Sequence, residues 1–302
     1  MRIIDSHVHI IEHLAGFGPR GELRALGKGR GRWATGEETQ FIPPEYGDKE
    51  FTAETLISLM KTNNIEKAVI LQGALYGFQN DYTAEAVRRY PEQLVGAGTL
   101  DPYCLDAVKI VDHFAKDFKF KLLKFEVSTE FGLSGYHIDF RIDGKEMELV
   151  WDAASQYDMT VVFDIGSYGT SSFQTDAILN VAGRYKNLRI VIAHLFLPSA
   201  SQEDMLIARL KEFKGDNIWF DIASLPVFVQ PEPYPYPTSL RYLTHAKKIA
   251  GAHRLIWGSD IPMMLTRASY AELLNYICDS GVFNSGELEG ILYNNAVEAF
   301  RI

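Results

Sequence analysis

The chain has 302 residues, of which 47% are hydrophobic and 23% charged, a composition typical of a folded globular protein rather than a disordered one. Its formal net charge of −9 argues against general binding to nucleic acid or to an anionic membrane surface, because both favour a basic face. No apolar run approaches the ~18 residues of a membrane helix, and the N-terminus lacks a signal-peptide pattern, so we expect a cytoplasmic protein.

Eight short runs rich in Val, Ile, Leu and Phe predict β-strands, at 3–9, 67–72, 94–100, 121–127, 160–165, 188–194, 217–223 and 254–260. Apolar spacing and capping residues predict helices between them, at 52–64, 81–91, 145–157, 173–185 and 201–213. Strands that alternate with helices pair in parallel. Eight such units predict a single-domain α/β protein over residues 1–302, a (β/α)8 TIM barrel, and the alternative is an open doubly wound sheet.

Two connections that follow predicted strands are unusually long. The first, about residues 11–50, includes a segment at 15–36 with seven glycines, and the second, at 224–238, has five prolines. Both leave the carboxyl ends of strands, where TIM-barrel enzymes carry their active sites. We therefore expect a long cap loop after the first strand, with the second connection completing the cap; surface decoration without a function is the alternative.

The first predicted strand ends in IIDSHVHI, residues 3–10. Because strand side chains alternate, Ile3, Asp5, His7 and His9 are expected to share the face that points into the barrel. Two adjacent buried imidazoles are hard to satisfy with ordinary core contacts. A divalent metal ion would take one nitrogen from each ring and leave the other nitrogen for an acceptor such as Asp5, so the pattern predicts a metal site.

Other predicted strands also carry ionisable residues near their carboxyl ends, namely Lys124, Glu126, Asp164, His194, Asp221 and Asp260. Burying such groups singly is costly. Their convergence on one barrel mouth therefore predicts a polar site around a cation. An ion-paired structural role stays open for each of them, and it is the interpretation we favour for Asp221.

These motifs resemble the amidohydrolase superfamily, and more narrowly its amidohydrolase-2 branch, which contains hydrolases and decarboxylases. The resemblance rests on DSHVH, AHL and WGSDIPM, in this order on the first, sixth and eighth strands, and on the closing segment ILYNNAVEAF. It implies one divalent metal ion, zinc or alternatively manganese, held by His7, His9 and Asp260. It also implies that His194 lies beside the substrate.

One position departs from the pattern of this branch, whose fifth strand usually ends in a metal-binding histidine. The matching stretch here, MTVVFDIGSYG, has Asp164 at that place. An aspartate oxygen can bind zinc or manganese, so we expect Asp164 to be a further metal ligand. A weak or absent metal, with Asp164 catalytic or only structural, is the alternative, and Glu126 is another candidate ligand.

The expected activity is hydrolysis, in which a metal-activated water attacks the carbonyl of an amide, ester or lactone. Asp260 would move the proton, and His194 would stabilise the carbonyl oxygen. The alternative is a metal-dependent decarboxylase of a small carboxylated, ring-derived substrate, with His194 or Asp260 protonating carbon. A metal-free binding protein with a degenerate site is a third hypothesis.

Basic residues in the first long connection suggest that the substrate is anionic. Arg30 and Arg32 are expected to hold a carboxylate, because a guanidinium binds that group through two parallel hydrogen bonds; solvated loop side chains are the alternative. Glu126 and His137 are expected to line the same pocket. The expected partner is this small molecule, whose identity the sequence does not give. A homo-oligomer is implied by the family resemblance alone.

Overall fold

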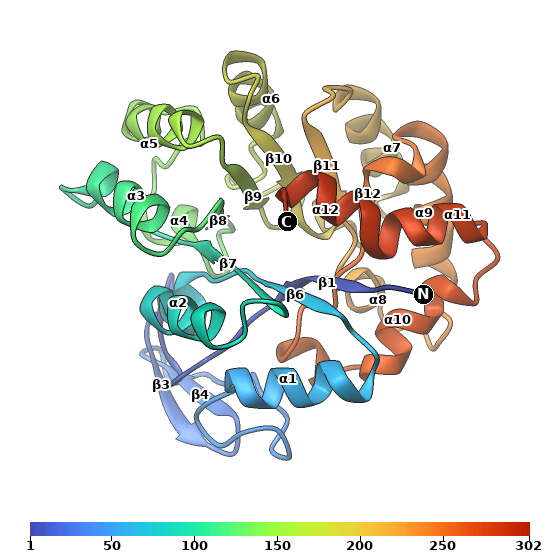
Figure 1. Ribbon diagram of the computed structural model, residues 1–302, viewed down its shortest axis with the longest axis horizontal. Coiled ribbons are helices and arrows are strands. Elements are labelled where there is room, and N and C mark those ends of the chain that lie inside the picture. Colours follow the sequence, from blue (N-terminus) through green and yellow to red (C-terminus); the bar gives the residue numbers. More distant parts are fainter.

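The computed structural model describes residues 1–302 and shows a ring of parallel strands surrounded by helices (Figure 1). Neighbouring strands follow the order β1-β6-β7-β8-β9-β10-β11-β12. Their bounds are β1 (Ile4–Val8), β6 (Lys67–Ile70), β7 (Leu94–Gly98), β8 (Leu122–Glu126), β9 (Thr160–Asp164), β10 (Arg189–Ile192), β11 (Ile218–Asp221) and β12 (Leu255–Ile256). The predicted strands and the (β/α)8 TIM barrel are confirmed.

Helices cover the outside of the ring and connect successive strands. The longer ones are α1 (Ala53–Thr62), α2 (Asn80–Arg89), α3 (Ala107–Lys116), α5 (Lys145–Gln156), α6 (Thr175–Arg184), α7 (Glu203–Glu212), α9 (Pro237–Ile249) and α10 (Tyr270–Cys278). Short ones are α4 (Leu133–Tyr136), α8 (Leu225–Phe228), α11 (Ser285–Glu289), α12 (Asn295–Phe300), η1 (Ala74–Tyr76), η2 (Ala193–Phe196), η3 (Ala252–Arg254), η4 (Met263–Thr266) and η5 (Gly290–Asn294). None of these helices combines the length and apolarity needed to span a membrane.

The barrel interior is a small apolar core that closes one end of the ring. It includes Leu122 of β8, Val162 of β9 and Trp219 of β11, together with residues of α12 that pack beneath them. Two positions further along each strand the same face carries Lys124, Asp164 or Asp221, because side chains alternate. The interior is therefore apolar near the closing helix and ionisable at the opposite, carboxyl end of the strands. A larger apolar cluster fills the space between strands and surrounding helices.

Strand β1 departs from the alternation that the sequence predicts. Ile4 belongs to the interior core, whereas Asp5 accepts a hydrogen bond from Tyr270 of α10, outside the ring. The pairing of β1 with β6 shifts register between Asp5 and Val8, as a β-bulge does. His7 and His9 still face the interior, but the expectation that Asp5 shares their face and accepts a hydrogen bond from their imidazole rings is wrong, because the bulge turns Asp5 outward.

Asp5 instead joins the two segments that close the ring. One of its carboxylate oxygens, Oδ1, accepts hydrogen bonds from the backbone N–H groups of Ser259 (2.8 Å) and His7 (3.3 Å). The other, Oδ2, accepts from the hydroxyls of Ser259 and Tyr270, both at 2.5 Å. Because Ser259 directly precedes Asp260, this single buried carboxylate fixes the position of β1 relative to the segment that carries Asp260.

Asp5→Ala is therefore expected to destabilise the protein by about 3–5 kcal/mol, since it leaves several buried donors without an acceptor. Urea unfolding of the variant against the wild type measures this difference. The control is Asp216→Ala, which removes a fully exposed carboxylate and is expected to change stability little. A loss below 1 kcal/mol for Asp5→Ala would show that the ring closes without this carboxylate.

The long connection after β1 forms an antiparallel sheet rather than an open loop. Its strands are β2 (Ala15–Gly18), β3 (Gly21–Gly27), β4 (Arg30–Trp33) and β5 (Glu38–Gln40), paired in that order. Gly16 is required where β2 passes η1, because a Cβ there would lie 1.8 Å from the carbonyl oxygen of Leu75. Along β4, Trp33 is buried and the alternating side chains of Arg30 and Arg32 face solvent.

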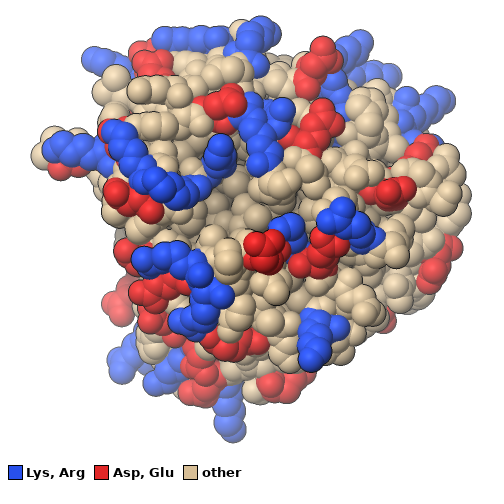
Figure 2. Space-filling model, viewed as in Figure 1, with Lys and Arg blue, Asp and Glu red and all other residues tan.

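Charged side chains of both signs are interspersed over the face of the molecule shown in Figure 2. Basic residues form no continuous stripe on this face, and acidic residues lie next to many of them. Exposed ion pairs elsewhere in the structure, such as Arg184 with Glu148 and Arg2 with Glu66, show the same mixing of signs. The face shown thus lacks the basic footprint that nucleic-acid binding favours.

Candidate active site

A pocket of about 240 Å³ opens at the carboxyl ends of the strands. Its polar lining comes from several strands and the loops that follow them, and comprises His7, His9, Lys124, Glu126, Ser128, Glu130, Asp164, Ser167, His194 and Asp260. Its apolar lining includes Leu75 and Tyr76 of η1, Phe131, Phe228 of α8, and Met263 of η4. The second long connection thus contributes to the pocket through α8, as expected for part of a cap.

His7 is oriented by a buried carboxylate. Its ring nitrogen Nδ1 lies 2.5 Å from Oδ2 of Asp221, and the backbone N–H of Ala223 donates to the other oxygen of Asp221 at 2.7 Å. Since a carboxylate can only accept, Nδ1 donates to Asp221, and the other nitrogen, Nε2, lies 3.7 Å from Oδ1 of Asp260. Asp221 therefore takes the orienting role that the sequence suggested for Asp5.

His9 presents a second imidazole to the same place. Its Nε2 lies 3.0 Å from Oδ1 of Asp260. Burial lowers the pKa of His9 to about 4 even though Asp260 opposes the change, so the ring is uncharged at neutral pH. The other nitrogen, Nδ1, is buried without a hydrogen-bond partner.

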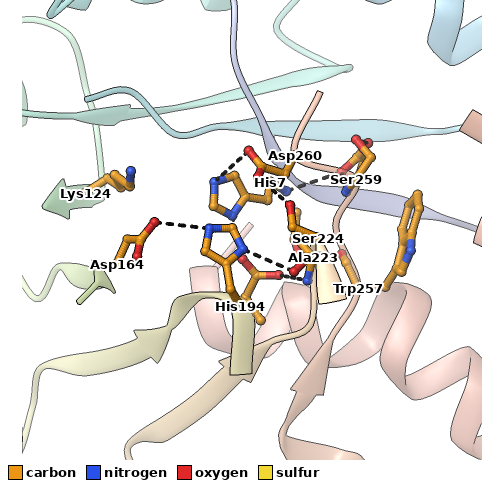
Figure 3. Close-up of polar contacts among 12 residues, drawn as sticks. His7, Lys124, Asp164, His194, Ala223, Ser224, Trp257, Ser259 and Asp260 are labelled. Atoms are coloured by element: carbon orange, nitrogen blue, oxygen red, sulfur yellow. Dashed lines mark hydrogen bonds and ion pairs between the residues drawn. The ribbon is translucent and has the colours of Figure 1, made fainter. Parts of the chain in front are cut away.

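Asp260 completes the arrangement from the segment after β12 (Figure 3). Its backbone has a φ of 58°, a left-handed conformation that few non-glycine residues adopt, and its N–H donates to the carbonyl of His7 at 2.7 Å. The Ser224 hydroxyl donates to Oδ2 at 2.5 Å. Burial opposes ionisation, but the histidines around it hold the pKa of Asp260 far below its usual range, so it is an anion.

These three side chains fit one divalent cation. One ligand atom from each of His7, His9 and Asp260 lies within 4.8 Å of the others, and the two distances to Oδ1 of Asp260 are 3.0 and 3.7 Å. Ligands of a tetrahedral zinc ion, at bond lengths near 2.0–2.1 Å, lie about 3.4 Å apart. Two imidazole nitrogens and one carboxylate oxygen at this spacing match that geometry.

His194 is held as a cation. It follows β10 within η2 in a left-handed conformation, with a φ of 56°. Its Nε2 lies 3.2 Å from Oδ2 of Asp164, and its Nδ1 lies 3.1 Å from the carbonyl oxygen of Ala223 (Figure 3). Both partners are acceptors, so both ring nitrogens must donate, which only the imidazolium can do. Burial opposes this charge, but Asp164 outweighs it and raises the pKa of His194 to about 10.

Asp164 lies beside His194 rather than among the three converging ligand atoms. Its Oδ1 accepts from the backbone N–H of Gly166 at 3.1 Å, and its Oδ2 faces the imidazolium. A second group of potential ligands, His7, His194 and Asp221, is less suitable for a metal ion because its ring nitrogens already bond to acceptors within the protein. The geometry therefore favours Asp164 as the counter-ion of His194.

The expected substrate-binding residues separate into two groups. Glu126 lines the pocket as expected, whereas Arg30, Arg32 and His137 do not. Arg30 and Arg32 are exposed on β4, where Arg30 pairs with Glu38, and His137 bonds to Asp101 at 2.8 Å. The alternation of β4 turns both arginines to solvent, so their predicted contact with a substrate carboxylate gains no support from the pocket geometry.

Three residues of the site were not assigned a functional role from the sequence. Lys124 and Asp221 are in phase with inward apolar residues of β8 and β11, and that phase is the signal that identifies them. Ser224 gives no such signal, because it reaches Asp260 through a left-handed turn with a φ of 60° after β11.

Comparison with known proteins gives one family and several structural relatives. A family model described as amidohydrolase matches residues 4–302. Among curated proteins, L-fucono-1,5-lactonase of Burkholderia ambifaria is 25% identical over 240 residues, which cover 76% of this chain and 78% of that protein.

Solved structures with the same fold share much less sequence. A probable 2-pyrone-4,6-dicarboxylic acid hydrolase of Acinetobacter baumannii, crystallised with citric acid, and a zinc-bound amidohydrolase of Burkholderia multivorans each superpose with a TM-score of 0.72, at 16% identity and full coverage of both chains. A 5-carboxyvanillate decarboxylase of Novosphingobium aromaticivorans, complexed with manganese, reaches 0.59 at 14% identity, covering 82% of this chain and 79% of its own. These similarities establish the shared barrel fold.

Proposed function

The chain belongs to the amidohydrolase family, and on that premise we propose that it is a metal-dependent hydrolase that opens a small lactone by attack of water on the ester carbonyl. The observation that carries the proposal is the convergence of His7, His9 and Asp260 at one edge of a pocket. The curated relative is a lactonase, and one structural relative is a probable hydrolase of a cyclic dicarboxylic acid, which supports hydrolysis.

A divalent cation held by His7, His9 and Asp260 would lower the pKa of a water molecule in its open position toward about 7 and polarise the substrate carbonyl. Zinc is the ion we propose, because two imidazole nitrogens and one carboxylate oxygen suit it well; manganese is the alternative. Zinc and manganese occur in structures of relatives, which supports both choices.

Each side chain of the site has a distinct task in the proposed reaction. The Asp260 carboxylate accepts a proton from the attacking water and returns it to the leaving alkoxide. The His194 imidazolium places a fixed positive charge in the pocket wall, which stabilises the oxyanion that develops on the carbonyl. Asp221 and Ser224 hold His7 and Asp260 in place through the hydrogen bonds described above.

We propose an ester rather than an amide because the curated relative is a lactonase, and because an alkoxide leaves with less help from a proton donor than an amine does. Decarboxylation remains a second candidate because a buried imidazolium such as His194 can protonate a carbon atom. Release of CO2 from carboxylated ring substrates distinguishes this reaction from hydrolysis.

The test uses the zinc-loaded protein with three groups of substrates, namely five- and six-membered lactones, the matching lactams, and carboxylated aromatic rings. Acid release at constant pH reports lactone opening, and trapped CO2 reports decarboxylation. We expect turnover of at least one lactone, none of the lactams, and no CO2. CO2 release without acid release would contradict the proposal and favour the decarboxylase, and inactivity on every lactone would exclude lactone hydrolysis.

A further inference from the structure

Lys124 places a buried ammonium group in the wall of the pocket. The residue is only 3% exposed, and its side chain reaches from β8 toward the space occupied by Asp164 and His7 (Figure 3). Its only hydrogen bond within the protein goes to Oε2 of Glu126, at 3.1 Å. An ammonium group has three donors, so two N–H bonds of Lys124 lack a protein acceptor in a pocket that it lines.

The surroundings keep this group both charged and accessible. Burial opposes the ammonium form, but the carboxylates of Glu126 and Asp164 outweigh it and raise the pKa of Lys124 above its ordinary value. Gly73 lies opposite, where a Cβ would approach Lys124 Nζ to 3.5 Å and Glu126 Cβ to 3.2 Å. The absence of a side chain at Gly73 thus leaves room beside the two charged groups.

Glu126 supplies acceptors next to these free donors. Its Oε2 faces Lys124, and its Oε1 accepts from the backbone N–H of Ser128 at 3.2 Å, so each oxygen has a further lone pair. Together the two side chains present donors and acceptors side by side without net charge. A hydroxyl group, which donates one hydrogen bond and accepts others, is complementary to such a pair, whereas a carboxylate would meet Glu126 as a like charge.

The overall charge of the pocket gives an anion no advantage either. The lining carries two more carboxylates than cations, so that one divalent ion would balance it; the carboxylates are Glu126, Glu130, Asp164 and Asp260, and the cations are Lys124 and His194. No arginine lines the pocket. A neutral substrate that carries hydroxyl groups is therefore the better match.

We propose that Lys124 and Glu126 recognise a hydroxyl group on the ring of the substrate, so that the enzyme selects a neutral, polyhydroxylated lactone. Lys124 donates to the hydroxyl oxygen, and Glu126 accepts the hydroxyl proton. This inference rests on the proposed lactone hydrolysis, and it names the class of substrate and the residues that select it.

The test measures binding, so that it does not depend on turnover. Zinc-loaded protein is titrated calorimetrically with three six-membered lactams that resist hydrolysis, one polyhydroxylated, one without hydroxyls and one carboxylated. We expect the polyhydroxylated lactam to bind at least ~100-fold more tightly than the deoxy lactam. An analogue that lacks the hydroxyl leaves the buried polar groups of the site without hydrogen-bond partners.

Variants then assign this selectivity to the pair. Lys124→Met and Glu126→Gln are each expected to reduce the ratio of the two dissociation constants below ~10, while Lys124→Arg, which keeps a donor, retains part of it. The matched control is Lys121→Met, at an exposed residue immediately before β8, which is expected to leave the ratio unchanged. Thermal unfolding of each variant verifies that it is folded.

The possible results separate this inference from the proposed function. If Lys124→Met weakens the hydroxylated and the deoxy lactam equally, or if the carboxylated lactam binds most tightly to the wild type, hydroxyl recognition by the pair is overturned even where lactones are hydrolysed. If lactones are not hydrolysed but the hydroxyl selectivity depends on Lys124, the recognition stands and the proposed reaction is wrong.

Discussion

Asp260→Asn is expected to lower kcat/KM on the lactone substrate by at least ~1,000-fold, which corresponds to about 4 kcal/mol of transition-state stabilisation. Asp260 is the only carboxylate among the three converging ligands, and its Oδ1 lies 3.0 Å from Nε2 of His9 and 3.7 Å from Nε2 of His7. An amide in its place removes the negative charge that balances a divalent cation. It also removes the base that accepts the proton of the attacking water.

Ser224→Ala is the matched comparison for this effect. It removes the hydroxyl that donates to Oδ2 but leaves the carboxylate itself, so we expect a loss of only about 10-fold. Steady-state kinetics of both variants at saturating zinc measure the difference. If Asp260→Asn keeps more than a tenth of wild-type kcat/KM, Asp260 neither moves the proton nor holds the ion.

Asp164→Asn is expected to move the alkaline limb of the kcat/KM pH profile to lower pH. In the wild type the pKa of His194 is raised to about 10, chiefly by Asp164 against the effect of burial, so the ring stays charged throughout the neutral range. An uncharged asparagine removes that attraction, and the pKa falls toward or below the ordinary value near 6.5. Activity at pH 8 should then drop by about 100-fold and recover at lower pH.

The same pair links stability to pH in a definite direction. Because the pKa of His194 is raised in the folded protein, its contribution to stability is fully present below the unfolded pKa near 6.5 and is lost as the pH rises through about 10. For the kcat/KM pH profile of Asp164→Asn, the control variant is His194→Gln. It is expected to abolish the alkaline limb of that profile rather than shift it. An unchanged limb in Asp164→Asn would show that the charge of His194 is not used.

The sequence predicts the barrel because its pattern is redundant. Each strand is buried on both faces and therefore reads as an apolar run such as KAVI or TVVF, and eight runs separated by helices leave few alternative topologies. The ionisable residues that follow inward apolar positions, including Lys124, Asp164 and Asp221, point into the ring for the same reason. Period-2 alternation thus accounts for much of the pocket lining.

The remaining features depend on irregular backbone conformations that cannot be predicted from a single sequence. The bulge in β1 turns Asp5 outward and Ile4 inward, the reverse of simple alternation. Left-handed conformations at His194, Ser224 and Asp260 direct these side chains toward the pocket after the strands have ended. Such conformations cost energy for residues with a Cβ and often occur at functional sites, which agrees with their position here.

The position of the two arginines outside the pocket lining has a related cause. The segment 15–36 is rich in glycine and reads as a loop, yet it pairs into an antiparallel sheet whose alternation buries Leu23 and Trp33. Arg30 and Arg32 therefore face solvent, and Arg30 forms an ion pair with Glu38. Charge composition alone did not reveal on which side of the sheet these side chains lie.

Direct measurement of metal binding tests the central claim, that His7, His9 and Asp260 hold one catalytic cation. Protein freed of metal with a chelator is titrated with zinc in a calorimeter, in parallel with His7→Ala and His9→Ala, and the metal content after dialysis is determined by mass spectrometry. The account predicts one zinc ion per wild-type chain and a large loss of binding in both variants. Wild-type protein that binds neither zinc nor manganese, or variants that bind zinc as tightly as the wild type, would contradict it.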